Sequence, residues 1–166
     1  MPVIGIIGGQ SHETASCLLE ILESAGVARE FSVIDLEQSA QTIPVDILTA
    51  AGESQIAGRV IDLRENHFFI MNPDQKDILT LAANSRGLLI TYGFNNKVCV
   101  TASSVMENEI QICVQRDLPT LSGGSVEQQE FGVSADTERR GAENWLAAIT
   151  AALVAGIQVM VLNKVY

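Results

Sequence analysis

Positive charge is scarce in this sequence of 166 residues, which has 10 lysine and arginine residues against 20 aspartate and glutamate residues. The formal net charge is therefore −10 at pH 7. A chain this acidic repels nucleic-acid phosphates and anionic lipid headgroups. We expect neither a nucleic acid nor a membrane as its partner.

Cysteine and histidine are also sparse. The three cysteines, Cys17, Cys99 and Cys113, form no Cys-x-x-Cys pair, and His12 and His67 are the only histidines. This pattern favours buried thiols in a reducing compartment over a disulfide framework, a zinc site or a multi-histidine metal centre.

Long hydrophobic runs are missing as well, and none approaches the roughly 20 residues of a membrane helix. The first run, Val3 to Ile7, follows Met1-Pro2 without a basic region and ends in glycines, unlike a signal peptide. We therefore expect a cytoplasmic protein. Hydrophobic residues still make up 47% of the chain, which is enough for the core of a single domain.

The first 96 residues alternate between short apolar runs and amphipathic segments. This alternation predicts a mostly parallel sheet with helices on both faces. The first helix is expected to have Ser11 as its N-cap and to end at Gly26. The expected strands are Val3–Ile7, Phe31–Leu36, Val45–Leu48, His67–Met71 and Leu88–Thr91, with further helices at residues 53–64 and 74–83.

From Lys97 onward the pattern is typical of a small antiparallel sheet. Residues Glu109–Gln115 alternate apolar and polar, and Glu107-Asn108 precedes them as a turn. Other strands are expected at residues 97–105, and as a pair through 120–121 and 126–133; a helix at 139–155 and an apolar tail at 159–162 follow. The predicted fold is one three-layer α/β domain with a parallel core (1–96), an antiparallel subsheet (97–135) and a C-terminal helix and tail (136–166).

The turn after the first strand has the position of a phosphate-binding loop. Backbone N–H groups and the helix dipole attract anions at such a turn. A working phosphate loop also supplies a lysine for the β- and γ-phosphates and a hydroxyl for Mg²⁺. Here Ser11, His12 and Glu13 stand where Gly-Lys-Ser/Thr would be. The turn comprises Gly8, Gly9, Gln10, Ser11, His12, Glu13 and Thr14.

Electrostatics oppose tight triphosphate binding at this turn. A unit-charge contact at about 4 Å is worth roughly 4 kcal/mol in an effective dielectric of about 20, whereas a helix dipole contributes only ~0.3–1 kcal/mol. A purely structural turn is one interpretation, with Ser11 as the cap and Glu13 complementing the dipole. A weak or altered anion site, and a nucleotide site that uses other groups, are the alternatives.

Two further charged pairs are open to more than one interpretation. Asp35 and Glu37 follow the second strand, where α/β sheets bind ligands, and could hold Mg²⁺ or form a solvated strand end. Arg139 and Arg140 stand at the expected start of the last helix, which is unfavourable for cations. They indicate either a partner contact or an exposed pair.

Three segments, in order, resemble the central, ATP-binding domain of the Mur ligases, which join amino acids to peptidoglycan precursors; folylpolyglutamate synthases are similar. The first runs from Ile4 to Thr14, with Leu18-Leu19 and Ala25-Gly26 after it. The second is Asn72-Pro73-Asp74 with Leu89-Ile90-Thr91-Tyr92-Gly93, followed by the β-rich residues 98–105, and the third is Gly141 to Ile149. The resemblance implies the fold of a P-loop NTPase or Mur ligase central domain.

The departures from this family argue against its reaction. The loop lysine is replaced by His12, and Glu143 replaces the family histidine that precedes Asn144. The chain's three lysines, Lys76, Lys97 and Lys164, offer no candidate for the family's carbamylated lysine. The resemblance thus implies, at most, a remnant nucleotide site at residues 8–14 and Asn144, with no cofactor; ATP and Mg²⁺ are disfavoured.

Three functions follow from the sequence. The first is a non-catalytic, Mur-ligase-like domain that binds a small ligand or a protein partner, as a homo-oligomer or in a complex. The second is the residual ATP-binding component of a split Mur-type amide ligase in peptidoglycan precursor synthesis. The third is a racemase, because Ile4 to Gly9 also resembles the start of aspartate/glutamate racemases. Those enzymes need two opposed cysteines, and neither Cys99 nor Cys113 has a fitting context.

Overall fold

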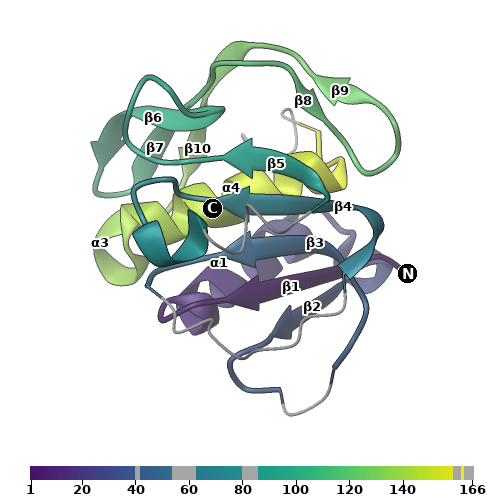
Figure 1. Cartoon of the computed structure of the whole chain (residues 1–166). Helices are drawn as coiled ribbons and strands as arrows, with labels where there is room; N and C mark the ends of the chain where they lie inside the picture. Colours follow the sequence, from purple (N-terminus) through teal and green to yellow (C-terminus); the bar gives the residue numbers. More distant parts are fainter. Residues whose placement is uncertain (40–41, 54–62, 80–85, 159–161, 163–166) are drawn as a thin grey trace.

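A five-stranded parallel sheet forms the centre of the computed structural model, which describes residues 1–39, 42–53, 63–79, 86–158 and 162. The strand order is β2-β1-β3-β4-β5, and every neighbouring pair is parallel (Figure 1). The predicted parallel α/β core is confirmed. The strands are β1 (Val3–Ile7), β2 (Ser32–Asp35), β3 (Val45–Ala50), β4 (Leu63–Met71) and β5 (Leu88–Thr91).

The continuous apolar runs form central strands because both faces of the sheet are covered. On β1, Ile4 and Ile6 pack into the larger core cluster, which includes side chains of the two long helices. Ile7 packs into a second cluster on the other face, together with Ile78 from the helical residues 76–79. Helical segments therefore cover both faces, as in a three-layer α/β fold.

Helix α1 (Ser11–Ser24) covers one face. Its helical spacing predicts an apolar stripe of Ala15, Leu18, Leu19, Leu22 and Ala25. Leu18 and Leu22 are fully buried, but Leu19 is 41% exposed, and Cys17 and Ile21 are buried on the inner face. Gly26 follows the helix with φ +74°, a conformation that glycine adopts at low cost, so the predicted helix end is confirmed.

Helix α4 (Ala142–Ala155) is buried on all sides from Asn144 to Ala155. It packs between the parallel sheet and a three-stranded antiparallel sheet of order β10-β7-β6 (Figure 1). The strands of this sheet are β6 (Val100–Met106), β7 (Glu109–Val114) and β10 (Gln129–Ser134). This central position explains why α4 is apolar all round rather than amphipathic.

The predicted helix at 139–155 is wrong at its start. Gly141, with φ +87°, separates α4 from the short helix α3 (Thr137–Arg140). Arg139 and Arg140 thus lie in the last turn of α3, where cations are favourable, rather than at a helix start. Arg140 is only partly exposed and pairs with Glu20 at 3.0 Å, so it ties α3 to α1.

The remaining predicted elements are confirmed in part, or lie outside the described residues. The turn at Gly123-Gly124 joins β8 (Leu118–Pro119) to β9 (Ser125–Val126), but β10 pairs with β7, so residues 126–133 are not one strand. A 3₁₀ turn, η1 (Ala28–Glu30), precedes β2. The helix expected at 53–64 lies outside the described residues except at its ends, where 63–64 belong to β4. Residues 80–83 and the tail 159–161 also lie outside them, while Leu162 is buried.

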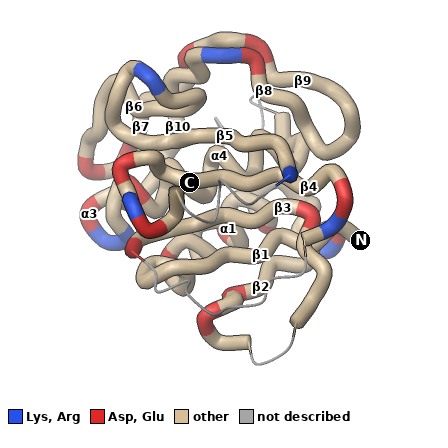
Figure 2. Tube along the Cα trace, viewed as in Figure 1, with Lys and Arg blue, Asp and Glu red and all other residues tan. Residues whose placement is uncertain are grey.

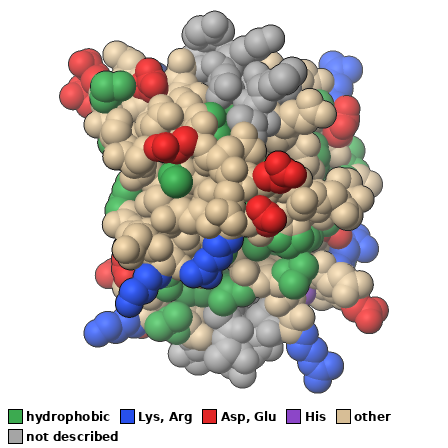
Figure 3. Space-filling model, turned by 90° about the horizontal axis from the view of Figure 1, so that it is seen from above, with side chains coloured by type: hydrophobic (Ala, Val, Ile, Leu, Met, Phe, Trp, Pro, Cys, Tyr) green, Lys and Arg blue, Asp and Glu red, His purple; other side chains and the backbone are tan. Residues whose placement is uncertain are grey.

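Surface charge is distributed without a dominant basic region among the described residues. Acidic positions recur along the loops (Figure 2), and the face seen from above is mostly uncharged polar side chains and backbone, with scattered charged and hydrophobic side chains (Figure 3). Among the described helices, none has the length and apolar character needed to cross a membrane.

Gly8 allows the turn after β1 to lie against the end of β3. Its φ is +119°, and a Cβ at this position would overlap the carbonyl oxygen of Ala51. We predict that Gly8→Ala lowers the free energy of unfolding by about 3 kcal/mol, because backbone strain and steric overlap add. Urea denaturation followed by circular dichroism measures this change.

Gly26→Ala is the matched control, because Gly26 also has positive φ but a Cβ added there would have nothing within 4 Å. Its expected cost is about 1 kcal/mol, from backbone strain alone. Equal destabilisation by the two substitutions would contradict the close packing of the turn against β3.

Candidate functional site

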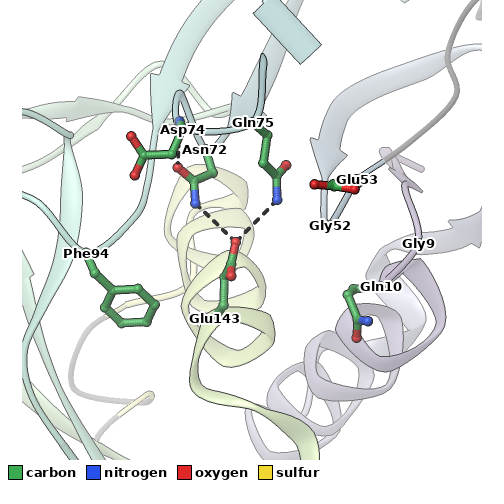
Figure 4. Close-up of a pocket in the computed structure, with 9 residues that line it drawn as sticks. All are labelled: Gly9, Gln10, Gly52, Glu53, Asn72, Asp74, Gln75, Phe94 and Glu143. Carbon is green, nitrogen blue, oxygen red and sulfur yellow. Dashed lines mark hydrogen bonds between the residues drawn. The ribbon is translucent and has the colours of Figure 1, made fainter. Parts of the chain in front are cut away.

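The carboxyl end of the parallel sheet holds a cavity of about 630 Å³. It lies where the chain leaves β1 toward β2 on one side and returns to β3 on the other. In open α/β sheets, ligands bind at such a point, where the strand order reverses. The lining residues are Gly9, Gln10, Gly52, Glu53, Asn72, Asp74, Gln75, Phe94 and Glu143 (Figure 4).

The turn after β1 does not present its backbone N–H groups to this cavity. Four consecutive N–H groups are hydrogen-bonded within the chain at 2.8–3.0 Å. A phosphate loop instead leaves such donors free for its ligand. The bonds run from Gly8 N to Glu37 Oε1, Gly9 N to Glu53 O, Gln10 N to Ala51 O, and Ser11 N to Gly8 O.

Ser11 was predicted to be the N-cap of α1, and this prediction is wrong. Its hydroxyl donates to Asp35 Oδ1 at 2.7 Å, and Gln10 occupies the N-cap position without a side-chain cap. Asp35 also accepts from the backbone N–H of Glu37 at 3.1 Å. Both carboxylates therefore hold the turn, although Glu37 is exposed to solvent and Asp35 is partly buried.

Asn144 joins the two long helices and does not line the cavity. Its Oδ1 accepts from the buried hydroxyl of Thr14 at 3.4 Å, and its Nδ2 donates to Gln10 Oε1 at 3.1 Å and to Arg140 O at 2.6 Å. Because these bonds use both ends of the amide, the side chain acts as a bridge between α1 and α4.

The predicted site residues therefore fall into three groups: residues that line the cavity, residues exposed outside it, and buried residues with structural contacts. Gly9 and Gln10 line the cavity. His12 and Glu13 are exposed on the first turn of α1, outside the cavity lining. Gly8, Ser11, Thr14 and Asn144 are buried and make the structural contacts described above.

Glu143 is the central side chain of the cavity and was not among the predicted site residues. It projects from the first turn of α4 toward Asn72 and Gln75, whose amides donate to its Oε1 at 3.1 and 3.3 Å (Figure 4). A carboxylate at this position is stabilised by the helix dipole. The structure therefore fixes a negative charge in the cavity.

Gln75 lies between Gly52 and Glu143. With its amide turned one way, Nε2 donates to Glu143 Oε1 at 3.3 Å. Turned the other way, the amide donates to the carbonyl of Gly52 at 3.2 Å and accepts from its N–H at 3.3 Å. In either orientation Glu143 keeps the bond from Asn72.

Tyr92 and Gly93 position the remaining wall. The buried Tyr92 hydroxyl donates to Ala50 O at 2.7 Å, which ties the end of β5 to the end of β3. Burial raises the pKa of Tyr92 well above its usual value, and Glu143 adds to this rise. Gly93, with φ +153°, passes close to Asn72 and leads to Phe94, whose side chain is 51% exposed beside the cavity.

Most of these lining residues lie within three residues of the end of a strand. Glu53 comes after β3, Asn72 after β4 and Phe94 after β5. The rule that places ligands at the carboxyl ends of parallel strands could have found them. Glu143 lacked such a signal, because its position depends on how α4 packs against the sheet.

None of the described residues that line the cavity is a cysteine. Cys17 is buried on the inner face of α1, and burial raises its pKa to about 12, more than the bond and charge of Arg140 lower it. Cys99 and Cys113 are partly exposed, and Cys99 bonds to Thr91 beside β5. The described residues also contain no group of three histidine, cysteine or acidic side chains placed to hold a metal ion.

In comparisons with known proteins, no model of a protein family matches the chain, and no curated protein matches it.

Cys17 provides a chemical test of the packing between α1 and the core. At pH 8 a thiol of pKa about 12 is ionised in about one molecule in 10,000, and only the thiolate is nucleophilic. We predict that iodoacetamide labels Cys99 and Cys113 in the native protein and leaves Cys17 unmodified. Peptide mass spectrometry measures this, with urea-unfolded protein as the control in which all three react. Native labelling of Cys17 as fast as that of the other two would contradict the packing.

Proposed function

We propose that this chain is a non-catalytic, Mur-ligase-like binding domain that takes a small ligand into the cavity between the ends of β1, β3 and β4. The observation that carries the proposal is the location of this polar cavity between the ends of β1 and β3, where the strand order reverses. Its volume of about 630 Å³ is in the range of small-molecule sites.

The chemistry of the lining supports recognition rather than bond formation. The described lining residues include no cysteine, serine, threonine, lysine or histidine, so the usual covalent nucleophiles other than a carboxylate are absent from them. Their polar groups are amides, carboxylates and backbone groups. Such groups select and orient a ligand by hydrogen bonding.

The competing function is residual ATP binding, as part of a split Mur-type amide ligase. A triphosphate at the turn would have to displace the four internal acceptors of residues 8–11. It would also approach the carboxylates of Asp35 and Glu37, and each like-charge contact at about 4 Å costs roughly 4 kcal/mol in an effective dielectric of about 20. These costs support a ligand without a triphosphate.

Amide NMR spectra test the proposal directly. We predict that Mg²⁺-ATP leaves the ¹H–¹⁵N signals of residues 8–14 unchanged. A concentration of about 5 mM is used, so that binding with a dissociation constant in the millimolar range would be detected. A library of small polar fragments is expected to give saturable shifts at Gly9, Gly52 and Asn72. The proposal would be overturned if fragments shift only the signals of residues outside the cavity, or if ATP shifts the signals of the turn.

A pair of apolar truncations controls this experiment. Phe94→Ala removes an exposed ring at the cavity and should weaken the fragment hits. Leu19→Ala removes an exposed side chain on α1 and should leave them unchanged. Equal effects of the two substitutions would place the fragments outside the cavity.

A further inference from the structure

We infer that the ligand of this cavity is an organic cation, an ammonium or guanidinium group on a short carbon chain. This inference rests on the proposed small-ligand function and names the chemistry of the ligand. It follows from the charge of the lining, from the Oε2 of Glu143, to which no described group donates, and from the exposed ring of Phe94.

The charge of the cavity has one sign. Glu53, Asp74 and Glu143 line it, and none of the described lining residues is a lysine, arginine or histidine. The side chains of Glu53 and Asp74 have no bonding partner among the described residues, and both are exposed. A cavity lined by one sign of charge concentrates ligands of the opposite sign.

The carboxylate of Glu143 leaves room for an additional donor. Asn72 donates to its Oε1, and no described group donates to its Oε2. A ligand that carries N–H donors can bond to this second oxygen.

The position of Phe94 selects an organic cation over a metal ion. Its ring lies beside the cavity, across from Gln10 and Glu53 (Figure 4). An exposed aromatic face attracts ammonium and guanidinium groups and also packs against their carbon chains.

The experiment uses four small probes on the full chain, read by amide NMR at pH 7. Butylammonium and agmatine, which carries both an ammonium and a guanidinium group, are the cations; butyramide is neutral and butyrate is an anion. The expected result is that both cations give saturable shifts at Gly9, Gly52 and Asn72, whereas butyramide and butyrate give none there.

Two charge-matched variants make the result specific. Glu143→Gln should weaken cation binding about tenfold, because it removes the charge and keeps an oxygen that accepts from Asn72. Glu23→Gln removes one charge at the exposed far end of α1 and should leave the affinity unchanged. Melting temperatures confirm that each variant folds.

A second substitution keeps the test informative if Glu143→Gln does not fold. Phe94→Leu keeps an apolar side chain but removes the ring, and should weaken the cations about threefold. The inference would be overturned if Phe94→Leu binds the cations as tightly as the unsubstituted chain. It would also be overturned if Glu143→Gln binds them as tightly as Glu23→Gln.

The outcomes also separate this inference from the proposed function. Binding of butyramide or butyrate in the cavity, as tight as that of the cations, would overturn the cation inference and leave the small-ligand function standing. If none of the four probes, and no fragment of the library, shifts the cavity signals, both are overturned.

Discussion

The backbone of the turn after β1 lies against the carboxyl end of β3 so closely that a side chain at Gly8 would overlap Ala51. This contact lets Gly9 and Gln10 donate to the backbone of Glu53 and Ala51. The start of α1 and the end of β3 are thereby fastened together. The cavity forms next to this junction, and its shape depends on it.

The same junction explains why a turn in the position of a phosphate loop has a different role here. Asp35 and Glu37 at the end of β2 accept from Ser11 and Gly8, so the donors that would face an anion are used inside the fold. The negative charge that remains in the cavity belongs to residues from other elements, Glu143 above all. The site thus has the geometry of an α/β switch point and a polarity suited to cations.

The sequence was sufficient where local patterns determine structure. Continuous apolar runs identified the five parallel strands, the periodicity of α1 identified the helix, and the alternation of β7 identified its buried face. It failed where long-range contacts decide. The hydroxyl of Ser11 reaches Asp35, which is 24 residues away, and the arginines before Gly141 end one helix rather than begin another. Of the predicted site residues, only Gly9 and Gln10 line the cavity. The central residue, Glu143, was missed because its position depends on the packing of α4.

Native-state hydrogen exchange at Gly8, Gly9, Gln10 and Ser11 tests most directly whether this turn is closed to anions. If their N–H groups are bonded within the chain, they should exchange at least about 100-fold more slowly than in an unfolded peptide. Adding Mg²⁺-ATP should leave these rates unchanged. Rapid exchange that becomes slow when Mg²⁺-ATP is added would contradict the closed turn, and with it the assignment of the cavity to ligands without a triphosphate.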